Sequence, residues 1–257
     1  MLQAGINLKS PRELEHMRQA GQVVAHIIDV LARAVHPGIR TGELDAIAER
    51  ETRAMGALPS FKGYRGYPAT ICVSVNEEIV HGIPGKRVLK EGDIVGIDVG
   101  AIVNGYQGDA AVTVGVGRIS PQAQRLMDTT RNALEAGIQA AKAGNRIGDI
   151  SWAIQRSAEA QGFSVVREYV GHGIGRALHE EPAIPNFGEP GKGIILRPGM
   201  AMALEPMVNV GTWRTRVKSD NWTVVTLDGS LSAHFEHTIA IRDGGPEVLT
   251  RLNGVGR

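Results

Sequence analysis

Cysteine, aromatic residues and net charge are all scarce in this sequence of 257 residues. The single cysteine, Cys72, excludes an internal disulfide framework. The formal net charge is +1, so no general attraction to nucleic acid or to a membrane surface is predicted. No apolar run reaches transmembrane length, and residues 1–15 contain no signal-peptide core. We therefore expect a cytoplasmic enzyme without a nucleic-acid or membrane partner. No apolar surface stripe remains unassigned, so we expect a monomer.

Glycine, in contrast, is abundant at 33 residues, and it marks a pattern that occurs twice. Residues 89–98, LKEGDIVGID, match residues 196–205, LRPGMAMALE, because leucine, a basic residue and glycine recur in step and each apolar run ends in an acid. Upstream, GIRTGELDAI at 38–47 corresponds to GNRIGDISWA at 144–153. A Ser-Pro pair that opens a predicted helix precedes each copy. Coincidence in a glycine-rich sequence is the alternative, but we favour duplication because the matched elements keep their order.

This repeat predicts a single α+β catalytic domain over residues 1–257, with internal halves at about 10–115 and about 120–242. Each half has two helices followed by strands. If a pseudo-twofold axis relates the halves, Asp98 and Glu205 occupy equivalent places at their junction. Helices would then cover the outer face of a curved, mainly antiparallel sheet. The apolar positions that predict the first helix are Leu14, Met17, Val24, Ile27, Ile28 and Leu31.

Four acidic residues lie within or at the ends of apolar, strand-like runs: Asp98, Asp109, Glu205 and Glu236. A carboxylate in an apolar strand is unfavourable unless it is compensated, and four that converge repel one another unless cations lie between them. Taken singly, each acid could lie on a solvated strand face or in a salt bridge. The set of four, together with His172 in a glycine-rich run, suits a pair of divalent transition metals better than one structural zinc. A mononuclear or purely structural metal site is the alternative.

Two turn signals predict how these acids are presented. The Asn104-Gly105 pair is typical of a two-residue hairpin turn, which places Asp98 opposite Ala111. Asp98 and Asp109 then point to the same face of that hairpin. A second hairpin is predicted with Asp228-Gly229 at its turn and Glu236 on its outgoing strand.

Three histidines lie in turns or runs rich in small residues. His172 and His179 are separated by several glycines, which argue against a helix and favour a strand or loop passing close to a ligand. His81 lies in another turn marked by glycine and proline. A lone histidine in such a turn is usually structural, but three beside a cluster of acids indicate a functional site.

The chain resembles the type I methionine aminopeptidases, which have the pita-bread fold. The motifs that carry the resemblance are GYRGYPATICVSVNEEIVHGIPG, EGDIVGIDVGAIVNGYQGDAAVTVGVG, GHGIGRALHEEP, MALEPMVN and FEHTIAI. Their order and spacing are specific, and they extend over nearly the whole chain. The resemblance implies hydrolytic, cotranslational removal of the initiator methionine from nascent polypeptides whose second residue is small. Proximity to the ribosome is plausible from this substrate alone.

The resemblance also implies a dinuclear centre, in which Asp109 and Glu236 bridge two metals, Asp98 binds one ion, and His172 and Glu205 bind the other. Two such ions would activate a water and polarise the scissile carbonyl. The ions would be Co(II), Mn(II), Fe(II) or Zn(II), and the sequence does not select among them.

The catalytic groups that the resemblance implies are His81, His179 and Glu205. We assign His179 to the carbonyl oxygen as it becomes an oxyanion, His81 to the scissile amide nitrogen, and Glu205 to proton transfer. The implied methionine pocket, which His81 and His179 also border, is formed by Phe61, Tyr64, Tyr67, Cys72, Leu178 and Trp222. Without the resemblance, Tyr67 and Trp222 would be assigned to the core. Leu178 and Phe61 depart from the residues common in the family, which affects the shape of the pocket.

Two rival functions remain at this stage. Prolidases and aminopeptidases P resemble the same ligand pattern but carry an additional N-terminal domain, which we do not expect here. A non-catalytic pita-bread module that binds peptides or ribosomes is the other alternative. Such modules lose metal ligands, whereas this sequence keeps every one of them.

Overall fold

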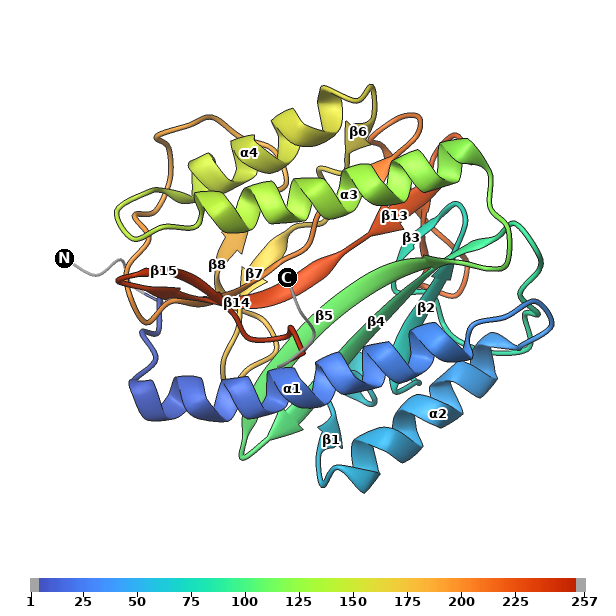
Figure 1. The fold of residues 1–257 in the computed structure, drawn as a ribbon, viewed down its shortest axis with the longest axis horizontal. Coiled ribbons are helices and arrows are strands. Elements are labelled where there is room, and N and C mark those ends of the chain that lie inside the picture. Colours follow the sequence, from blue (N-terminus) through green and yellow to red (C-terminus); the bar gives the residue numbers. More distant parts are fainter. Residues whose placement is uncertain (1–4, 253–257) are drawn as a thin grey trace.

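The computed structural model describes residues 5–252, and Figure 1 shows a large curved sheet with helices packed against one of its faces. The helices are α1 (Pro11–Ala34), α2 (Thr41–Ala54), α3 (Pro121–Ala140) and α4 (Ile147–Glu159), with a 3-10 turn η1 at Tyr64–Gly66. Within this part of the chain, no helix has both the length and the apolar composition needed to cross a membrane.

The main sheet has nine strands, and every pairing in it is antiparallel. Its strands run in the order β1 (Leu58–Pro59), β4 (Ile94–Val103), β5 (Tyr106–Gly115), β14 (Glu236–Arg242), β9 (Ala201–Leu204), β7 (Gly171–Gly173) and β8 (Glu180–Ile184), with β2 (Ile71–Val75) on β4 and β15 (Gly245–Val248) on β14. One small sheet has β13 (Ser232–His234), β10 (Met207–Asn209) and β6 (Ser164–Val165). The other has β11 (Thr215–Val217), β12 (Val224–Thr226) and β3 (Glu78–Val80). The expected α+β architecture is confirmed.

Helices α1 and α3 begin at the Ser-Pro pairs, as the sequence predicts. Ser10 caps α1 and forms a reciprocal capping box with Glu13, and Ser120 caps α3 through the backbone N–H of Ala123. The two remaining helices start in matching ways, since the N–H groups of Arg40 and Arg146 each donate to a carboxylate three residues on. These caps satisfy backbone donors that a helix start otherwise leaves without partners.

Matching backbone hydrogen bonds also recur in the two repeat units. Gly38 N donates to Leu89 O at 2.8 Å, and Gly144 N donates to Leu196 O at 3.0 Å, at the places that the sequence repeat aligns. Each unit has its own apolar core, one beneath α1 and α2 and the other beneath α3 and α4. We infer from these correspondences that the chain arose by internal duplication.

The central hairpin, β4–β5, has the predicted register. Asp98 pairs with Ala111, and the turn lies at Asn104-Gly105, where both residues have positive φ. Ile97 and Val99 belong to the core under the helices. Because side chains alternate along a strand, Asp98 and Asp109 point to the opposite, open face of the sheet.

The second predicted hairpin is wrong in its pairing. Asp228-Gly229 does lie at a turn region, but the strands on either side join different sheets: β12 pairs with β11 and β3, whereas β13 pairs with β10. Glu236 begins the next strand, β14, which pairs directly with the central hairpin. The acid therefore reaches the hairpin as a neighbour in the main sheet.

Candidate metal centre and adjoining pocket

The structure brings every residue proposed from the sequence around one cavity on the open face of the main sheet. Asp98 of β4 and Glu236 of β14 each pair in register with Ala111 of β5. The three residues therefore form one row across three neighbouring strands. Glu205 follows β9 directly, and His172 lies on β7, which pairs with β9. The lining also includes Arg65, which the sequence analysis did not single out.

His172 is held in the tautomer that a metal ligand needs. Its Nδ1 lies 2.9 Å from the carbonyl oxygen of Gly173, which can only accept, so Nδ1 carries the proton. Burial lowers the pKa of His172 to about 4, which keeps the ring neutral. Its Nε2 therefore offers a lone pair, and it lies 3.5 Å from Glu205 Oε1 and 3.9 Å from Asp109 Oδ2.

Among the described residues, three of the four carboxylates have a buried oxygen without a hydrogen-bond donor. The enclosed atoms Asp98 Oδ1, Asp109 Oδ1 and Glu236 Oε1 have no partner within residues 5–252. Burial, followed by repulsion from the neighbouring carboxylates, raises the pKa of Asp109 and of Glu236 well above the ordinary value. Buried acids without donors are stabilised in their charged form by bound cations.

Oxygen and imidazole ligands in this arrangement fit divalent transition metals. One ligand atom each from Asp109, His172 and Glu236 lies within 4.8 Å of the other two, which is the spread expected around one ion. Asp98 on β4 and Glu205, directly after β9, add two further carboxylates to the lining of the same cavity. The donor set and its unsatisfied oxygens therefore fit a metal centre.

His234 is a further histidine at this centre that the sequence analysis missed. Its buried Nε2 lies 3.9 Å from Glu205 Oε2 and 3.7 Å from Glu236 Oε2. A signal for it was present, because His234 is two residues before Glu236, and alternate residues of a strand share a face.

His81 is held in a strained turn by several hydrogen bonds. Its backbone adopts φ +61°, which is uncommon for a residue other than glycine. The next residue, Gly82, donates its N–H to Ser74 Oγ at 3.1 Å, and its carbonyl accepts the hydroxyl of Tyr67 at 2.9 Å. Burial lowers the pKa of His81 to about 4, so the ring is neutral near neutral pH.

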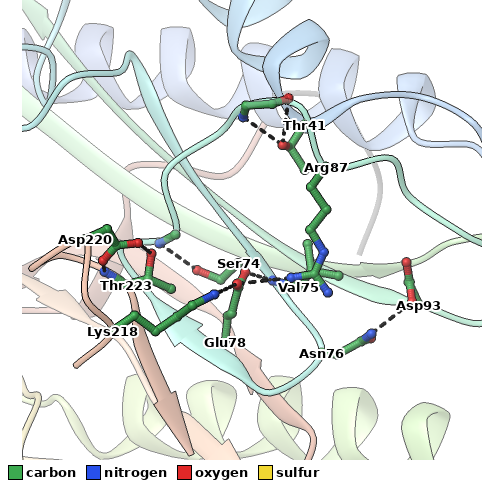
Figure 2. Close-up of polar contacts among 12 residues, drawn as sticks. Thr41, Ser74, Val75, Asn76, Glu78, Arg87, Asp93, Lys218, Asp220 and Thr223 are labelled. Carbon is green, nitrogen blue, oxygen red and sulfur yellow. Dashed lines mark hydrogen bonds and ion pairs between the residues drawn. The ribbon is translucent and has the colours of Figure 1, made fainter. Parts of the chain in front are cut away.

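Figure 2 shows a polar network in which Glu78 contacts Val75, Arg87 and Lys218. Glu78 lies three residues before His81; its carboxylate accepts the N–H of Val75 and lies 3.0 Å from Arg87 Nη1 and 2.9 Å from Lys218 Nζ. Lys218 begins the loop that carries Trp222 into the cavity.

That loop is closed by Asp220, which accepts the N–H groups of Trp222 and Thr223 at 3.0 and 2.8 Å (Figure 2). The closed turn fixes the direction in which Trp222 leaves the backbone. The ring of Trp222 then lies edge-on to Tyr67, with centroids 5.0 Å apart.

His179 lies at the exposed mouth of the cavity, beside His172. The two imidazole rings have centroids 4.2 Å apart, and the hydroxyl of Tyr64 lies 2.9 Å from Nδ1 of His179. The following residue, Glu180, forms a buried ion pair with Lys9 that anchors this loop to the N-terminal segment. The glycines around His172 pack against neighbouring backbone: a Cβ at Gly171 would meet Ala203 O at 2.4 Å.

The apolar part of the cavity matches a medium-sized apolar side chain. Its walls are Phe61, Tyr64, Tyr67, Cys72, Leu178 and Trp222. The whole cavity, which includes the carboxylate and histidine cluster, has a volume of about 150 Å³. Burial raises the pKa of Cys72 well above its ordinary value, so the thiol stays neutral and acts as a soft, polarisable wall.

Comparison with known proteins gives one consistent match. Residues 15–243 match the model of metallopeptidase family M24. The chain is 57% identical over 244 residues to methionine aminopeptidase 1 of Bacillus subtilis, covering 95% of this chain and 98% of that protein. The crystal structure of methionine aminopeptidase from Thermotoga maritima superposes with a TM-score of 0.95 at 49% identity, over 96% of this chain and 99% of that one.

A prolidase shares the architecture at much lower similarity. The prolidase from Pyrococcus furiosus superposes with a TM-score of 0.78 at 22% identity, over 96% of this chain but only 66% of that one. This likeness establishes the shared fold alone.

Proposed function

The chain belongs to metallopeptidase family M24, and from that membership and the geometry of the cavity we infer that it is a methionine aminopeptidase. It hydrolyses the first peptide bond of polypeptides that begin with methionine and releases that residue. The observation that carries this inference is the carboxylate and histidine cluster, which opens directly into a side-chain pocket walled by aromatic rings and a thiol. Nascent polypeptides are the substrates, and we propose that those with a small second residue are preferred and that cleavage occurs in the cytoplasm near the ribosome.

We propose two divalent ions per chain as the cofactors. Asp98, Asp109, His172, Glu205 and Glu236 would hold them. When bound, such ions lower the pKa of water and polarise carbonyl groups, which supplies a nucleophile at neutral pH. The donor set supports Co(II), Mn(II), Fe(II) or Zn(II).

The side chains around the cluster have separate roles in substrate binding and catalysis. The pocket binds the methionine side chain, which orients the first peptide bond across the carboxylate cluster. His179, at the mouth, donates to the carbonyl oxygen as negative charge develops on it. His81, on the opposite loop beside Trp222, orients the amide nitrogen that becomes the leaving amine.

Glu205 is the proposed proton carrier. Its carboxylate borders the cavity and lies 3.5 Å from Nε2 of His172, so it would be within reach of a water held there and could accept and return its proton.

Two rival functions are less well supported. A prolidase activity is supported only by a shared fold, since the chain is 22% identical to the prolidase from Pyrococcus furiosus. The chain is 57% identical to a methionine aminopeptidase. A non-catalytic binding module would have no need for the complete set of metal-type ligands and outer histidines around one cavity.

A panel of three peptides tests the proposed function. We expect metal-dependent release of methionine from Met-Ala-Ser and little or none from Met-Leu-Ser, with Ala-Pro-Ser intact. Cleavage of Ala-Pro-Ser in place of Met-Ala-Ser would establish the prolidase alternative. The variant His179→Ala should reduce kcat by about 100-fold, as the loss of an oxyanion donor does elsewhere; unchanged turnover would refute its role.

A further inference from the structure

The buried imidazole of His234 has no role in the function proposed above. The residue is 4% exposed, and its Nε2 has no hydrogen-bond partner within the described part of the chain. A buried polar atom without a partner is costly and is uncommon in native structures. This nitrogen instead faces two carboxylates of the centre.

The backbone of His234 is fixed independently of those carboxylates. Its N–H donates to Thr113 Oγ1 at 2.9 Å, and the same hydroxyl donates to its carbonyl oxygen at 2.8 Å. In addition, β13 pairs His234 with Met207 of β10. Thr113 is on β5, so the backbone of His234 is tied to the central hairpin and to the segment that follows Glu205.

In each of the two glutamates, one carboxylate oxygen faces His234 and the other faces the interior of the centre. Glu205 turns Oε2 toward His234 and Oε1 toward Nε2 of His172, at 3.9 and 3.5 Å respectively. Glu236 turns Oε2 toward His234 at 3.7 Å, and its Oε1 is enclosed without a partner. Both separations exceed hydrogen-bond length, so a donor at Nε2 of His234 lies between the two carboxylates and reaches one oxygen of either after a side-chain shift, which leaves the second oxygen for a metal.

We propose that His234 is a positioning residue, whose Nε2–H holds the carboxylates of Glu205 and Glu236 in the orientation that binds the ions. This inference rests on the proposed metal centre, but it concerns a residue outside the five proposed ligands. Outer groups that orient metal ligands contribute about 10- to 100-fold to metal affinity.

Three substitutions separate this role from the alternatives. His234→Gln keeps an N–H donor at similar reach but is a poor metal ligand. His234→Asn keeps polarity but is too short to reach both carboxylates, and His234→Leu removes the donor. His237→Gln is the matched control, because His237 is half-buried next to Glu236 but its Nδ1 lies 2.9 Å from the hydroxyl of Thr250.

The experiment is calorimetric titration of each metal-free protein with Mn(II), after near-ultraviolet circular dichroism has shown a native fold. We expect the affinity of His234→Leu and His234→Asn to fall about 10- to 100-fold, and that of His234→Gln and His237→Gln to stay within about threefold of the unmodified protein. If His234→Leu fails to fold, the comparison of Asn with Gln carries the test.

Two results would overturn the proposal. Unchanged Mn(II) affinity in a folded His234→Asn or His234→Leu protein would show that the ring does not position the glutamates. Equal losses in His234→Gln and His234→Asn, with fewer ions bound, would make the ring nitrogen a ligand itself. Failure of the proposed enzymatic function would be distinct, because the unmodified protein would then bind Mn(II) without releasing methionine.

Discussion

The hydroxyl of Tyr64 lies 2.9 Å from Nδ1 of His179, and the two rings stack with centroids 5.4 Å apart. When the hydroxyl donates to Nδ1, the proton of a neutral imidazole must be on Nε2. His179 is then ready to donate from Nε2 to a carbonyl oxygen. With the hydroxyl as the donor, this contact gives the tautomer that the proposed oxyanion role requires.

Replacing Tyr64 by phenylalanine should lower kcat for Met-Ala-Ser about three- to tenfold with a smaller change in KM. The loss corresponds to one neutral hydrogen bond, about 0.5–1.5 kcal/mol. Steady-state kinetics of Tyr64→Phe measure it. The control is Tyr106→Phe, because the Tyr106 hydroxyl donates to Glu13 at 2.8 Å on the helix side of the protein. Equal kcat values for Tyr64→Phe and the unmodified enzyme would show that the hydroxyl does not control the tautomer.

The half-buried ring of His81 should make stability depend on pH. Its pKa is about 4 in the folded protein and 6.5 for an unperturbed histidine, so the unfolded chain takes up a proton first on acidification. The contribution of the neutral His81 ring to the free energy of unfolding is fully present above pH 6.5. It is lost as the pH falls toward 4. From these values, His81 alone should lower the free energy of unfolding by roughly 2 kcal/mol between about pH 7.5 and about pH 5.

Denaturant unfolding of the metal-free protein and of His81→Asn at both pH values measures this difference. Asparagine is uncharged and tolerates the positive φ at this position. We expect the variant to lose roughly 2 kcal/mol less than the unmodified protein on acidification. Parallel losses in the two proteins would contradict the lowered pKa of His81.

Neutralising Glu78 should destabilise the segment that precedes His81 and the loop that carries Trp222. Glu78→Gln keeps an acceptor for Val75 but leaves Arg87 and Lys218 without their counter-charge. Because both cations are about 40% exposed, we expect a loss of about 1–2 kcal/mol of unfolding free energy, less than for a fully buried pair. KM for Met-Ala-Ser should rise more than kcat falls, since Trp222 borders the methionine pocket.

Asp29→Asn is the control for this prediction, because Asp29 pairs with Arg33 on the exposed surface of α1. Its effect should stay below about 0.5 kcal/mol. If Glu78→Gln matched this control in both stability and KM, the network in Figure 2 would have no part in supporting the pocket.

The parts of the site that the sequence predicts well depend on local rules. The Asn104-Gly105 turn fixes the register of its hairpin, and side-chain alternation then places Asp98 and Asp109 on one face. The pairing around Asp228-Gly229 could not be predicted in this way. The strand partners of β12 are β3 and β11, and β3 is distant in sequence, so the choice depends on tertiary contacts that no local pattern specifies.

Among the side chains outside the ligand set, too, some could be predicted from a local pattern and others could not. The walls of the methionine pocket were identified from family resemblance, because Tyr67 and Trp222 by themselves are indistinguishable from core aromatics. His234 was not predicted because only Glu236 was assigned to the expected hairpin strand. His234 lies two residues before Glu236 in the same strand-like run, and this spacing places two residues on one face of a strand.

The central claim is that the carboxylate cluster binds metal ions that enable methionine release. Its most direct test is to strip the protein with a chelator, add back Mn(II), Co(II), Fe(II) or Zn(II), and measure bound ions and methionine release from Met-Ala-Ser together. We expect no activity in the stripped protein, two ions bound per chain after metal is added back, and rapid methionine release with at least one metal. A folded protein that binds two ions and releases no methionine with any of the four would contradict this claim.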